Sequence, residues 1–324
     1  MGNIDPLQKI NGDFKGKDIL SLTQFSPKDI EKLFNVTWKM KHLASDNRPS
    51  LILQGKIASL LFYEPSSRTF GSFSSAMMRL GGSTIAIQNP QAVSSVAKGE
   101  TLEDTIKTFE NYCDVIIIRS SNVGDSTKAA KAAFFVPIIN AGDGTGEHPT
   151  QALLDLFTIY EKFGSLNNLT GLLAGDMLNG RTVHSLIKGL SLYKNNTLYL
   201  LSPMNLKLKK DDLENFRKSG IKIIEITSEK EIPKTCHFWY WTRVQKERFT
   251  SLSEYEKVKH SFVLTPKLLE QFGNQKMVVM HPLPRVGEIK EAVDSDPRAL
   301  YLTSQMKNGV FVRMALLALV LGKI

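Results

Sequence analysis

Cysteine is scarce in this 324-residue chain, which contains only Cys113 and Cys236. Two thiols cannot build a disulfide framework or a four-ligand zinc site, so we expect both to be buried free thiols. Long apolar runs are also missing. The longest, 314–321, is well short of the roughly 20 residues that a membrane span needs. The first residues hold no apolar signal core, and we therefore expect a reducing, cytoplasmic location and no membrane partner.

Acidic residues are the minority charge, with 32 Asp and Glu against 41 Lys and Arg and a net charge of +9. This excess suits either nucleic acid or small anionic ligands. The basic residues are spread out, and the densest stretch, 207–218, is interleaved with acidic ones. A solvated helix face explains such a stretch better than a nucleic-acid stripe, so we expect no nucleic-acid partner.

The glycine fingerprint of dinucleotide-binding proteins is absent. The glycines of 175–180 lack the required spacing, and no acidic residue clearly takes the ribose role. The sequence also shows no cluster with metal-ligand spacing and no nucleophile–base pair. We therefore expect no metal and no other cofactor.

Short apolar runs alternate with helical patterns along the chain. Strands are expected at 57–62, 84–87, 115–118, 136–139, 171–174, 197–201, 221–226, 237–241 and 277–280. Helices are expected after Ser26 and at 66–80, 101–112, 128–133, 149–163, 181–193 and 310–321. This alternation predicts an α/β protein of two domains, each a mostly parallel sheet covered by helices on both faces. We place the first domain at 1–148, completed by a C-terminal helix at 307–324, and the second at 149–306.

Polar residues gather in the loops that follow the expected strands, where ligands bind in such sheets. The loop 62–69 precedes a helix, whose N-terminal N–H groups and dipole attract anions. It contains Ser66, Ser67 and Thr69, and Arg68 adds a forked guanidinium suited to phosphate. An ordinary N-cap beside a solvated arginine is the alternative.

A second loop, 140–151, is rich in glycine and contains His148 just before Pro149 at a helix start. A helix N-terminus disfavours the imidazolium, so His148 is a candidate neutral donor to a carbonyl oxygen, with a helix cap as the alternative. Gln151 lies one turn further on. Arg119 ends an apolar strand, where its charge needs either a ligand or a loop carboxylate.

The second half of the chain has similar junctions. Arg181 begins a helix, and Arg243 and Gln245 follow the apolar run 238–241. Together, the arginines, the histidine and the glutamines at these junctions predict a site for substrates with several negative charges.

These motifs resemble those of the aspartate transcarbamoylase family. The resemblance covers nearly the whole chain and rests on 62–69, 98–101, Arg119, 140–151, 180–185, 242–248, 281–285 and Arg313. It implies transfer of the carbamoyl group of carbamoyl phosphate to L-aspartate, giving N-carbamoyl-L-aspartate and phosphate in pyrimidine biosynthesis. The nearest alternative is ornithine transcarbamoylase, which has a cysteine where this chain has Pro282 and whose cationic substrate suits Arg243 poorly.

The resemblance also implies roles for the phosphate and carbamoyl ligands. The residues that would hold the phosphate are Ser66, Ser67, Arg68, Thr69 and Arg119. Those that would polarise the carbamoyl oxygen are Thr69, Arg119 and His148. The carbamoyl amine would be held by Gln151 and by the backbone carbonyls of Leu283 and Pro284.

For the second substrate, the resemblance assigns the aspartate carboxylates to Arg181, Arg243 and Gln245. It implies a homotrimer in which Ser94 and Lys98 come from a neighbouring subunit. Regulatory chains or other pyrimidine-pathway enzymes as partners are left open. A non-catalytic homologue would be expected to have lost Arg68, His148 or Lys98, and all three are present.

Three further positions complete the resemblance. Arg313 would have a structural role in the C-terminal helix. Ser67 stands where the family usually has Thr or Gly, and Phe70 stands where an arginine is common. We expect the change at Phe70 to alter packing or charge rather than chemistry.

Overall fold

The computed structural model describes residues 5–46, 50–93, 95–246 and 249–324. The chain forms two compact units: unit 1 contains 1–154 and 308–324, and unit 2 contains 155–307. The division falls inside helix α6 (Pro149–Phe163), whereas the sequence placed it at the start of that helix. The C-terminal helix α11 (Ser304–Val320) begins in unit 2 and lies mostly in unit 1.

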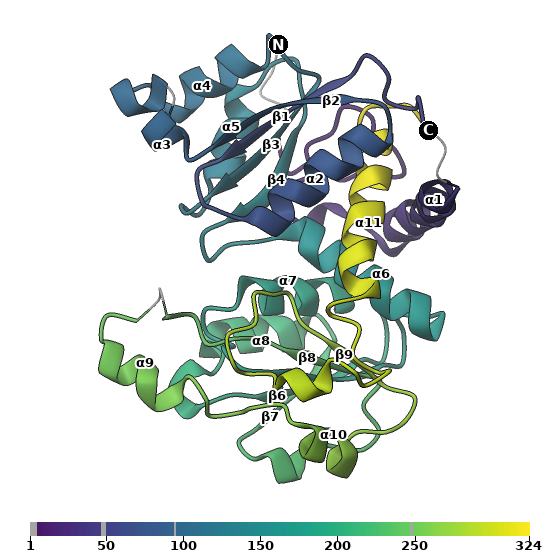
Figure 1. Ribbon diagram of the computed structural model, residues 1–324, viewed down its shortest axis with the longest axis vertical. Coiled ribbons are helices and arrows are strands. Elements are labelled where there is room, and N and C mark those ends of the chain that lie inside the picture. The colour runs from purple at the N-terminus through teal and green to yellow at the C-terminus, as the bar shows by residue number, and fades with distance from the viewer. Residues whose placement is uncertain (1–4, 47–49, 94, 247–248) are drawn as a thin grey trace. The chain divides into compact units, whose positions relative to one another are not determined.

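Unit 1 is built on a four-stranded parallel sheet with the order β2-β1-β3-β4 (Figure 1). The strands are β1 (Ile57–Phe62), β2 (Ser83–Gln88), β3 (Val115–Ser120) and β4 (Ile138–Asp143). Phe62 pairs with Arg119 and Ser120 with Asp143, so β1, β3 and β4 end side by side. The loops that follow these three strands therefore share one edge of the sheet.

Helices cover both faces of this sheet. Figure 1 shows α4 (Leu102–Phe109) and α5 (Asp125–Ala132) on one side, and α2 (Ser67–Arg79), α11 and α1 (Pro27–Ser45) on the other. Ile106 of α4 and Ala129 of α5 share a buried cluster with Leu61 and Ile118. Burial on both faces explains why β1 and β3 are continuous apolar runs rather than alternating ones.

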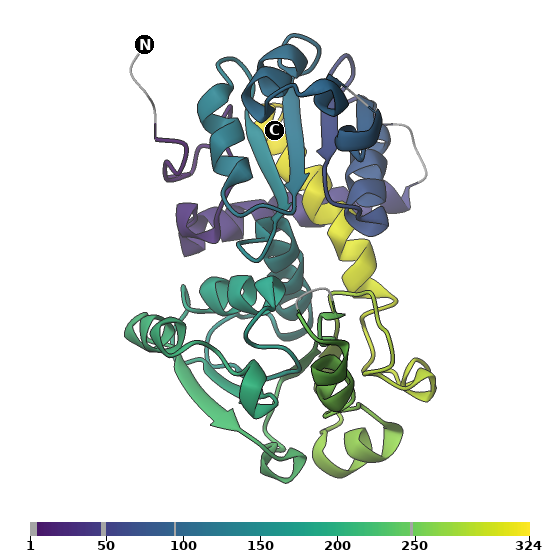
Figure 2. The ribbon, with the colours of Figure 1, turned by 90° about the vertical axis from the view of Figure 1, so that its left-hand side faces the viewer.

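Unit 2 contains a five-stranded parallel sheet with the order β7-β6-β5-β8-β9. Figure 2 shows the ribbon turned by 90° from Figure 1. Its strands are β5 (Thr170–Ala174), β6 (Thr197–Leu201), β7 (Lys222–Ile226), β8 (Phe238–Trp241) and β9 (Val278–Met280). Its described α-helices, besides its parts of α6 and α11, are α7 (Arg181–Leu190), α8 (Lys210–Lys218), α9 (Leu252–Val258) and α10 (Pro266–Phe272).

Successive residues of β8 face opposite sides of the unit 2 sheet. Trp239 and Trp241 share a buried cluster with Leu268 and Leu269 of α10. The hydroxyl of Tyr240, on the other face, donates to Asp155 of α6 at 2.8 Å. The predicted fold class is therefore confirmed: two parallel sheets, each covered by helices on both faces.

Some local predictions were wrong. The segment 91–99, for which the sequence predicted no helix, contains the end of the short helix α3 (Pro90–Val93) and a 3-10 helix at Ser95–Lys98. Cys236 is buried as expected, but Cys113 is only half-buried and its thiol donates to Phe109 O. Burial raises the pKa of Cys113 to about 11, so its thiol stays protonated at neutral pH.

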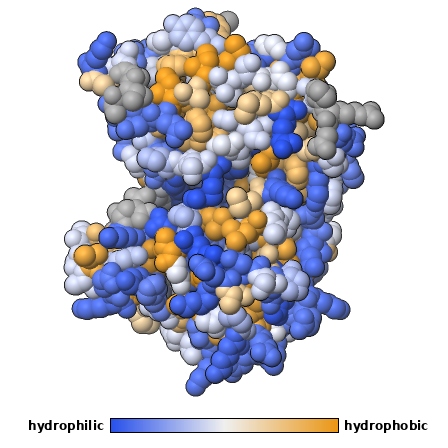
Figure 3. All heavy atoms as spheres, in the orientation of Figure 1, coloured by the Kyte–Doolittle hydropathy of each residue, from blue (hydrophilic) through white to orange (hydrophobic). Residues whose placement is uncertain are grey.

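On the face drawn in Figure 3, hydrophilic side chains are spread over both units, with smaller hydrophobic groups among them. Among the described residues, none of the helices has both the length and the apolar character to cross a bilayer.

Candidate active site

The loop between β1 and α2 places four predicted residues at a helix N-terminus. Ser66 is the N-cap of α2, and its side chain makes no capping hydrogen bond. Ser67 and Arg68, in the first turn, are exposed, whereas Thr69 is buried. The first N–H groups of a helix point outward and carry partial positive charge, so this end of α2 can hold an anion.

Arg119 lies beside this loop, because β3 is the neighbour of β1. Its side chain is only 7% exposed and donates to Ala141 O at 2.9 Å. It also forms an ion pair of 2.6 Å with Glu64. The sequence raised a loop carboxylate as one possible partner for this arginine, and Glu64 is that carboxylate. A buried guanidinium with one acidic neighbour can exchange that neighbour for an anionic ligand.

The loop between β4 and α6 is held by its own carboxylates. Asp143 accepts the Glu147 N–H at 2.7 Å, and Glu147 accepts the Ser21 hydroxyl at 2.9 Å. A Cβ at Gly146 would lie 2.6 Å from an oxygen of Asp143, and Gly144 has a φ of 55°. These two glycines are therefore required by the close turn that ends at His148.

His148 is 4% exposed and lies directly before α6. Its Nε2 is 3.5 Å from the Thr69 hydroxyl, so the first and second loops meet at this pair. Gln151 is half-buried in the first turn of α6. Unit 1 therefore brings Thr69, Arg119 and His148 to one edge of its sheet, with each side chain fixed by burial.

Arg313 of α11 forms hydrogen bonds with residues near the N-termini of both α2 and α6. Its guanidinium donates to Ser72 of α2 at 2.7 Å and to Thr150 of α6 at 3.3 Å, and it lies over the ring of Phe73. This agrees with the structural role predicted for Arg313. Phe70, one of the departures from the family pattern, packs edge-on against Phe62 with ring centroids 5.3 Å apart.

Lys98 is exposed at the end of the 3-10 helix that precedes α4. Ser94, the other residue assigned to a neighbouring subunit, lies outside the described residues. Arg248, at the end of one of the motifs, does so as well.

In unit 2, two loops follow the adjacent strands β5 and β8. The first, 175–180, leads into α7, which begins at Arg181; the second, 242–246, contains Arg243 and Gln245. The Gln245 side-chain amide donates to Asn179 O at 2.9 Å and so ties the loops together. Arg181, Arg243 and Gln245 are all half-buried.

Asp176 is the buried anchor of these two loops. It is 0% exposed and accepts the Asn179 N–H at 2.9 Å and, more weakly, the Gln245 N–H at 3.5 Å. Burial raises the pKa of this carboxyl, while the hydrogen bonds from Asn179 and Gln245 oppose the rise. Asp176 thus fixes the backbone that carries the candidate carboxylate ligands of unit 2.

Leu283 and Pro284 lie in the loop 281–288, which follows β9. Leu283 is half-buried against the unit 2 core and has a φ of 57°, and Pro284 is exposed. The peptide bond between them is cis. Their carbonyls are backbone groups, so their usefulness as ligands depends on how this loop is held.

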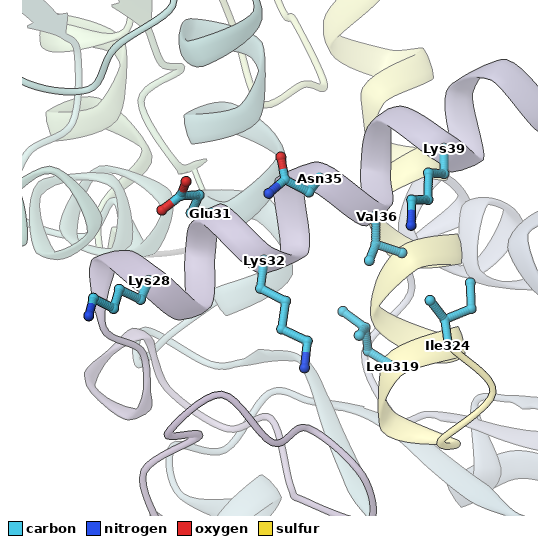
Figure 4. A pocket seen from close by; sticks show the side chains of 8 residues that line it. All are labelled: Lys28, Glu31, Lys32, Asn35, Val36, Lys39, Leu319 and Ile324. Atoms are coloured by element: carbon cyan, nitrogen blue, oxygen red, sulfur yellow. The ribbon is translucent and has the colours of Figure 1, made fainter.

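A pocket of about 500 Å³ in unit 1 lies away from these loops. Six α1 residues and two C-terminal ones line it: Lys28, Glu31, Lys32, Asn35, Val36, Lys39, Leu319 and Ile324. Figure 4 shows Val36 facing Leu319 and Ile324, with Lys28 far from them along α1. None of the predicted site residues lines this pocket. Among the described residues, no group of His, Cys, Asp and Glu has metal-site geometry.

Two family models match the chain. One, described as the aspartate/ornithine carbamoyltransferase carbamoyl-P binding domain, matches 17–161. The other, described as the Asp/Orn binding domain of the same enzymes, matches 167–320. The chain belongs to the aspartate/ornithine carbamoyltransferase family. The family models thus divide the sequence between carbamoyl-phosphate and amino-acid domains in the order that the resemblance implied.

Individual relatives point to the aspartate branch of this family. The chain is 46% identical over 311 residues to the aspartate carbamoyltransferase catalytic subunit of Thermococcus kodakarensis, covering 96% of this chain and 98% of that one. It is 50% identical over 307 residues to the multifunctional protein pyr1-3 of Dictyostelium discoideum. That match covers 95% of this chain but only 14% of the much longer relative.

A solved structure agrees with these sequences. The Trypanosoma cruzi aspartate transcarbamoylase in complex with carbamoyl aspartate and phosphate superposes with a TM-score of 0.87 at 40% identity. The superposition covers 95% of this chain and 97% of the other. The comparisons confirm the resemblance stated from the sequence and favour aspartate over ornithine.

The sequence did not single out Glu64 or Asp176. Glu64 lies in a loop already recognised, but nothing in the sequence pairs it with Arg119. Asp176 lies among the glycines of 175–180, where an acidic residue reads as an ordinary turn former. A signal was available for Asp176, because a carboxylate three residues before Asn179 is typical of a turn in which a side chain accepts backbone N–H groups.

Proposed function

We propose that this chain transfers the carbamoyl group of carbamoyl phosphate to the amine of L-aspartate in pyrimidine biosynthesis. The observation that carries the proposal is the convergence of Thr69, Arg119 and His148 at the N-termini of α2 and α6. Such a set suits a phosphate and a polarised carbonyl together. The net charge of +9 fits substrates that are all anions.

In this proposal, unit 1 holds carbamoyl phosphate. The phosphate is bound by Ser66, Ser67, Arg68, Thr69 and Arg119. To bind it, the Arg119 guanidinium gives up its ion pair with Glu64. His148, Thr69 and Arg119 donate to the carbamoyl oxygen, on which negative charge develops as the amine attacks. Preorganised donors of this kind are worth about 3–4 kcal/mol each in the transition state.

Unit 2 supplies the second substrate's ligands. Arg181 and Arg243, with Gln245, bind the two carboxylates of aspartate, and Gln151 of unit 1 and the Leu283 and Pro284 carbonyls hold the carbamoyl amine. The leaving phosphate can accept the proton of the attacking amine, so the reaction needs no side-chain base. No metal or organic cofactor takes part in this scheme.

The direct test is a product assay with labelled carbamoyl phosphate. We expect N-carbamoyl-L-aspartate with aspartate and no product with ornithine, in the presence of a chelator. Citrulline as the main product would replace the proposal with its ornithine alternative. Activity lost on chelation and restored by a divalent ion would refute the cofactor-free scheme.

We also propose that the chain acts in the cytoplasm as a homotrimer whose sites are shared. The support is the exposure of Lys98, which lies on a 3-10 helix where it can reach outward, together with the family resemblance. His148→Ala and Lys98→Ala should each be nearly inactive. The two variants are then dissociated, mixed in equal amounts and reassembled. If sites are shared, about a quarter of all sites should combine an intact His148 with an intact Lys98, by counting around a three-fold ring. Proven subunit exchange without any recovery would exclude sharing.

A further inference from the structure

The loop 281–288 is held by a buried, hydrogen-bonded pair of side chains that the proposed chemistry does not use. His281 and Glu288 are 2% and 3% exposed, and His281 Nε2 lies 2.7 Å from Glu288 Oε1. The couple lies at the two ends of the loop, at its first and last residues. Both side chains turn inward, while Pro284 and Val286 between them are exposed.

Each member of the couple also accepts a backbone N–H from the loop. Leu283 N donates to His281 Nδ1 at 2.7 Å, and Val286 N donates to Glu288 Oε2 at 2.9 Å. The two donors lie on opposite sides of Pro284. The couple therefore clamps both limbs of the loop to the buried end of β9.

The hydrogen bonds also fix the tautomer of His281. Because Nδ1 accepts the Leu283 N–H, the proton of the neutral ring is on Nε2, which donates to Glu288. The carboxylate thus selects the ring form that can hold Leu283. Burial alone would raise the pKa of Glu288. Its interactions with His281 and its backbone hydrogen bonds together outweigh burial and keep this pKa below its usual value, so the carboxylate stays charged.

Leu283 needs such a partner because its backbone is in the left-handed region. A φ of 57° strains the backbone of a leucine and persists only where the surroundings enforce it. The bond from Leu283 N to His281 orients the peptide before this residue. The Leu283 carbonyl follows directly after this fixed N–H and left-handed φ, so its direction depends on both.

We infer that His281 and Glu288 are positioning residues, which set the Leu283 and Pro284 carbonyls at the angle that receives the carbamoyl amine. The inference rests on the proposed function, in which those carbonyls are ligands. Both side chains are buried, and in this proposal neither His281 nor Glu288 is a ligand of the substrate. Their effect is transmitted through the loop backbone, so it is predicted to appear in turnover rather than in aspartate binding.

Two amide variants separate the two hydrogen bonds of His281. In His281→Asn, the side-chain oxygen lies near the position of Nδ1 and can still accept from Leu283 N, but the reach to Glu288 is lost. In His281→Gln, the longer side chain reaches Glu288 but leaves Leu283 N without its acceptor. The two variants share one functional group and differ mainly in which partner they keep.

We expect kcat to fall about 10-fold or more in His281→Gln and to stay within about threefold of wild type in His281→Asn, since small displacements at a reacting centre are costly. KM for aspartate should be unchanged in both. The stability should follow the opposite order, because His281→Asn leaves Glu288 buried without its donor. Equal kcat values, or a lower value for the Asn variant, would overturn the inference while leaving wild-type carbamoyl transfer, and so the proposed function, intact.

Hydrogen exchange at the Leu283 amide provides the second readout, which needs no substrate. Protection should be lost in His281→Gln and kept in His281→Asn. Loss of protection in neither variant, or in both alike, would show that His281 does not hold Leu283. If the wild-type enzyme makes no carbamoyl aspartate, the proposed function fails and the amine-positioning role fails with it. The exchange data then still report whether the clamp exists.

Discussion

The two units hold their candidate ligands in different ways. In unit 1 the ligands come from helix starts and from a strand end, and Thr69, Arg119 and His148 are themselves buried. In unit 2, Arg181 is half-buried at the start of α7, and Arg243 and Gln245 are half-buried in the loop after β8. The buried group there is Asp176, which ties the loops after β5 and β8 together. Unit 1 therefore stabilises the ligands directly, whereas unit 2 stabilises the backbone that carries them.

This difference predicts which kinetic constant a mutation in each unit should change. A substitution in unit 1 removes a hydrogen-bond donor or a cation from the place where charge develops in the reaction, and turnover should be reduced most. A substitution at the anchor of unit 2 displaces intact ligands, and binding of the second substrate should suffer most. The following variants test that division, starting with the one expected to have the largest effect.

Arg68→Ala should lower kcat at least 100-fold, because it removes a cation from the anion-binding start of α2. The thermal unfolding temperature should change little, since Arg68 is exposed. Steady-state kinetics with both substrates saturating will measure the effect. Arg79→Ala, at the other end of the same helix, is the matched control and should be near wild type. Near-native turnover of Arg68→Ala would remove Arg68 from the site.

Asp176→Ala should raise KM for aspartate about 10-fold, as a loop anchor that accepts several hydrogen bonds is lost. KM for carbamoyl phosphate should stay unchanged, because its main ligands lie in unit 1. Asp211→Ala, an exposed acidic residue on α8, serves as the control. If the carbamoyl phosphate KM rose as much as the aspartate KM, the proposed division of labour would be wrong.

Glu64→Gln should strengthen binding of inorganic phosphate by a few-fold. The carboxylate pairs with Arg119, and phosphate must displace it to reach the guanidinium. Titration calorimetry with phosphate alone isolates this competition from the chemistry. Glu103→Gln, on exposed surface of α4, is the comparison. Weaker phosphate binding in Glu64→Gln would mean that the carboxylate positions Arg119 instead of competing for it.

Asp18→Asn tests unit 1 away from its ligands and should leave turnover unaffected. Burial raises the pKa of Asp18 to about 6, above its ordinary value of 3.8. The folded protein thus holds this proton more tightly than the unfolded chain does, and the resulting stability is lost as the pH rises from about 4 to 6. The loss is at most about 3 kcal/mol.

The asparagine retains an oxygen for the Ile138 N–H and has no charge to bury. Urea unfolding at pH 4 and pH 7 should therefore show a smaller difference for Asp18→Asn than for wild type. Asp13→Asn, which is exposed, should behave like wild type. An unchanged pH dependence in Asp18→Asn would place the responsible group elsewhere.

The sequence predicted the layered fold because buried parallel strands leave an unmistakable pattern of short apolar runs. It also predicted that Arg68, His148 and Arg181 lie where a strand is followed by a helix, since ligands bind at such junctions in parallel sheets. The 3-10 helix before α4 was missed, because a single turn of four residues carries too few apolar positions to show a period.

Side-chain pairings that depend on how the chain folds back on itself could not be predicted from the sequence. Glu64 and Arg119 are brought together by the pairing of β1 with β3, and the clamp of His281 and Glu288 depends on a turn that reverses the chain. Neither is encoded in local spacing. The half-exposure of Cys113 was missed for a similar reason, because it depends on what packs over the start of β3.

The path of the chain through unit 1 has a consequence for biosynthesis. Residues 312–320 of α11 are all buried in unit 1, and Gly16 donates to Val320 O at 2.8 Å. These residues leave the ribosome only after the whole of unit 2 has been made. Until then, the sheet of unit 1 has no permanent cover over part of one face, although its strands were synthesised first. The half of the molecule that is translated earliest is therefore the last to be completed, and it is the half that a chaperone has most reason to bind.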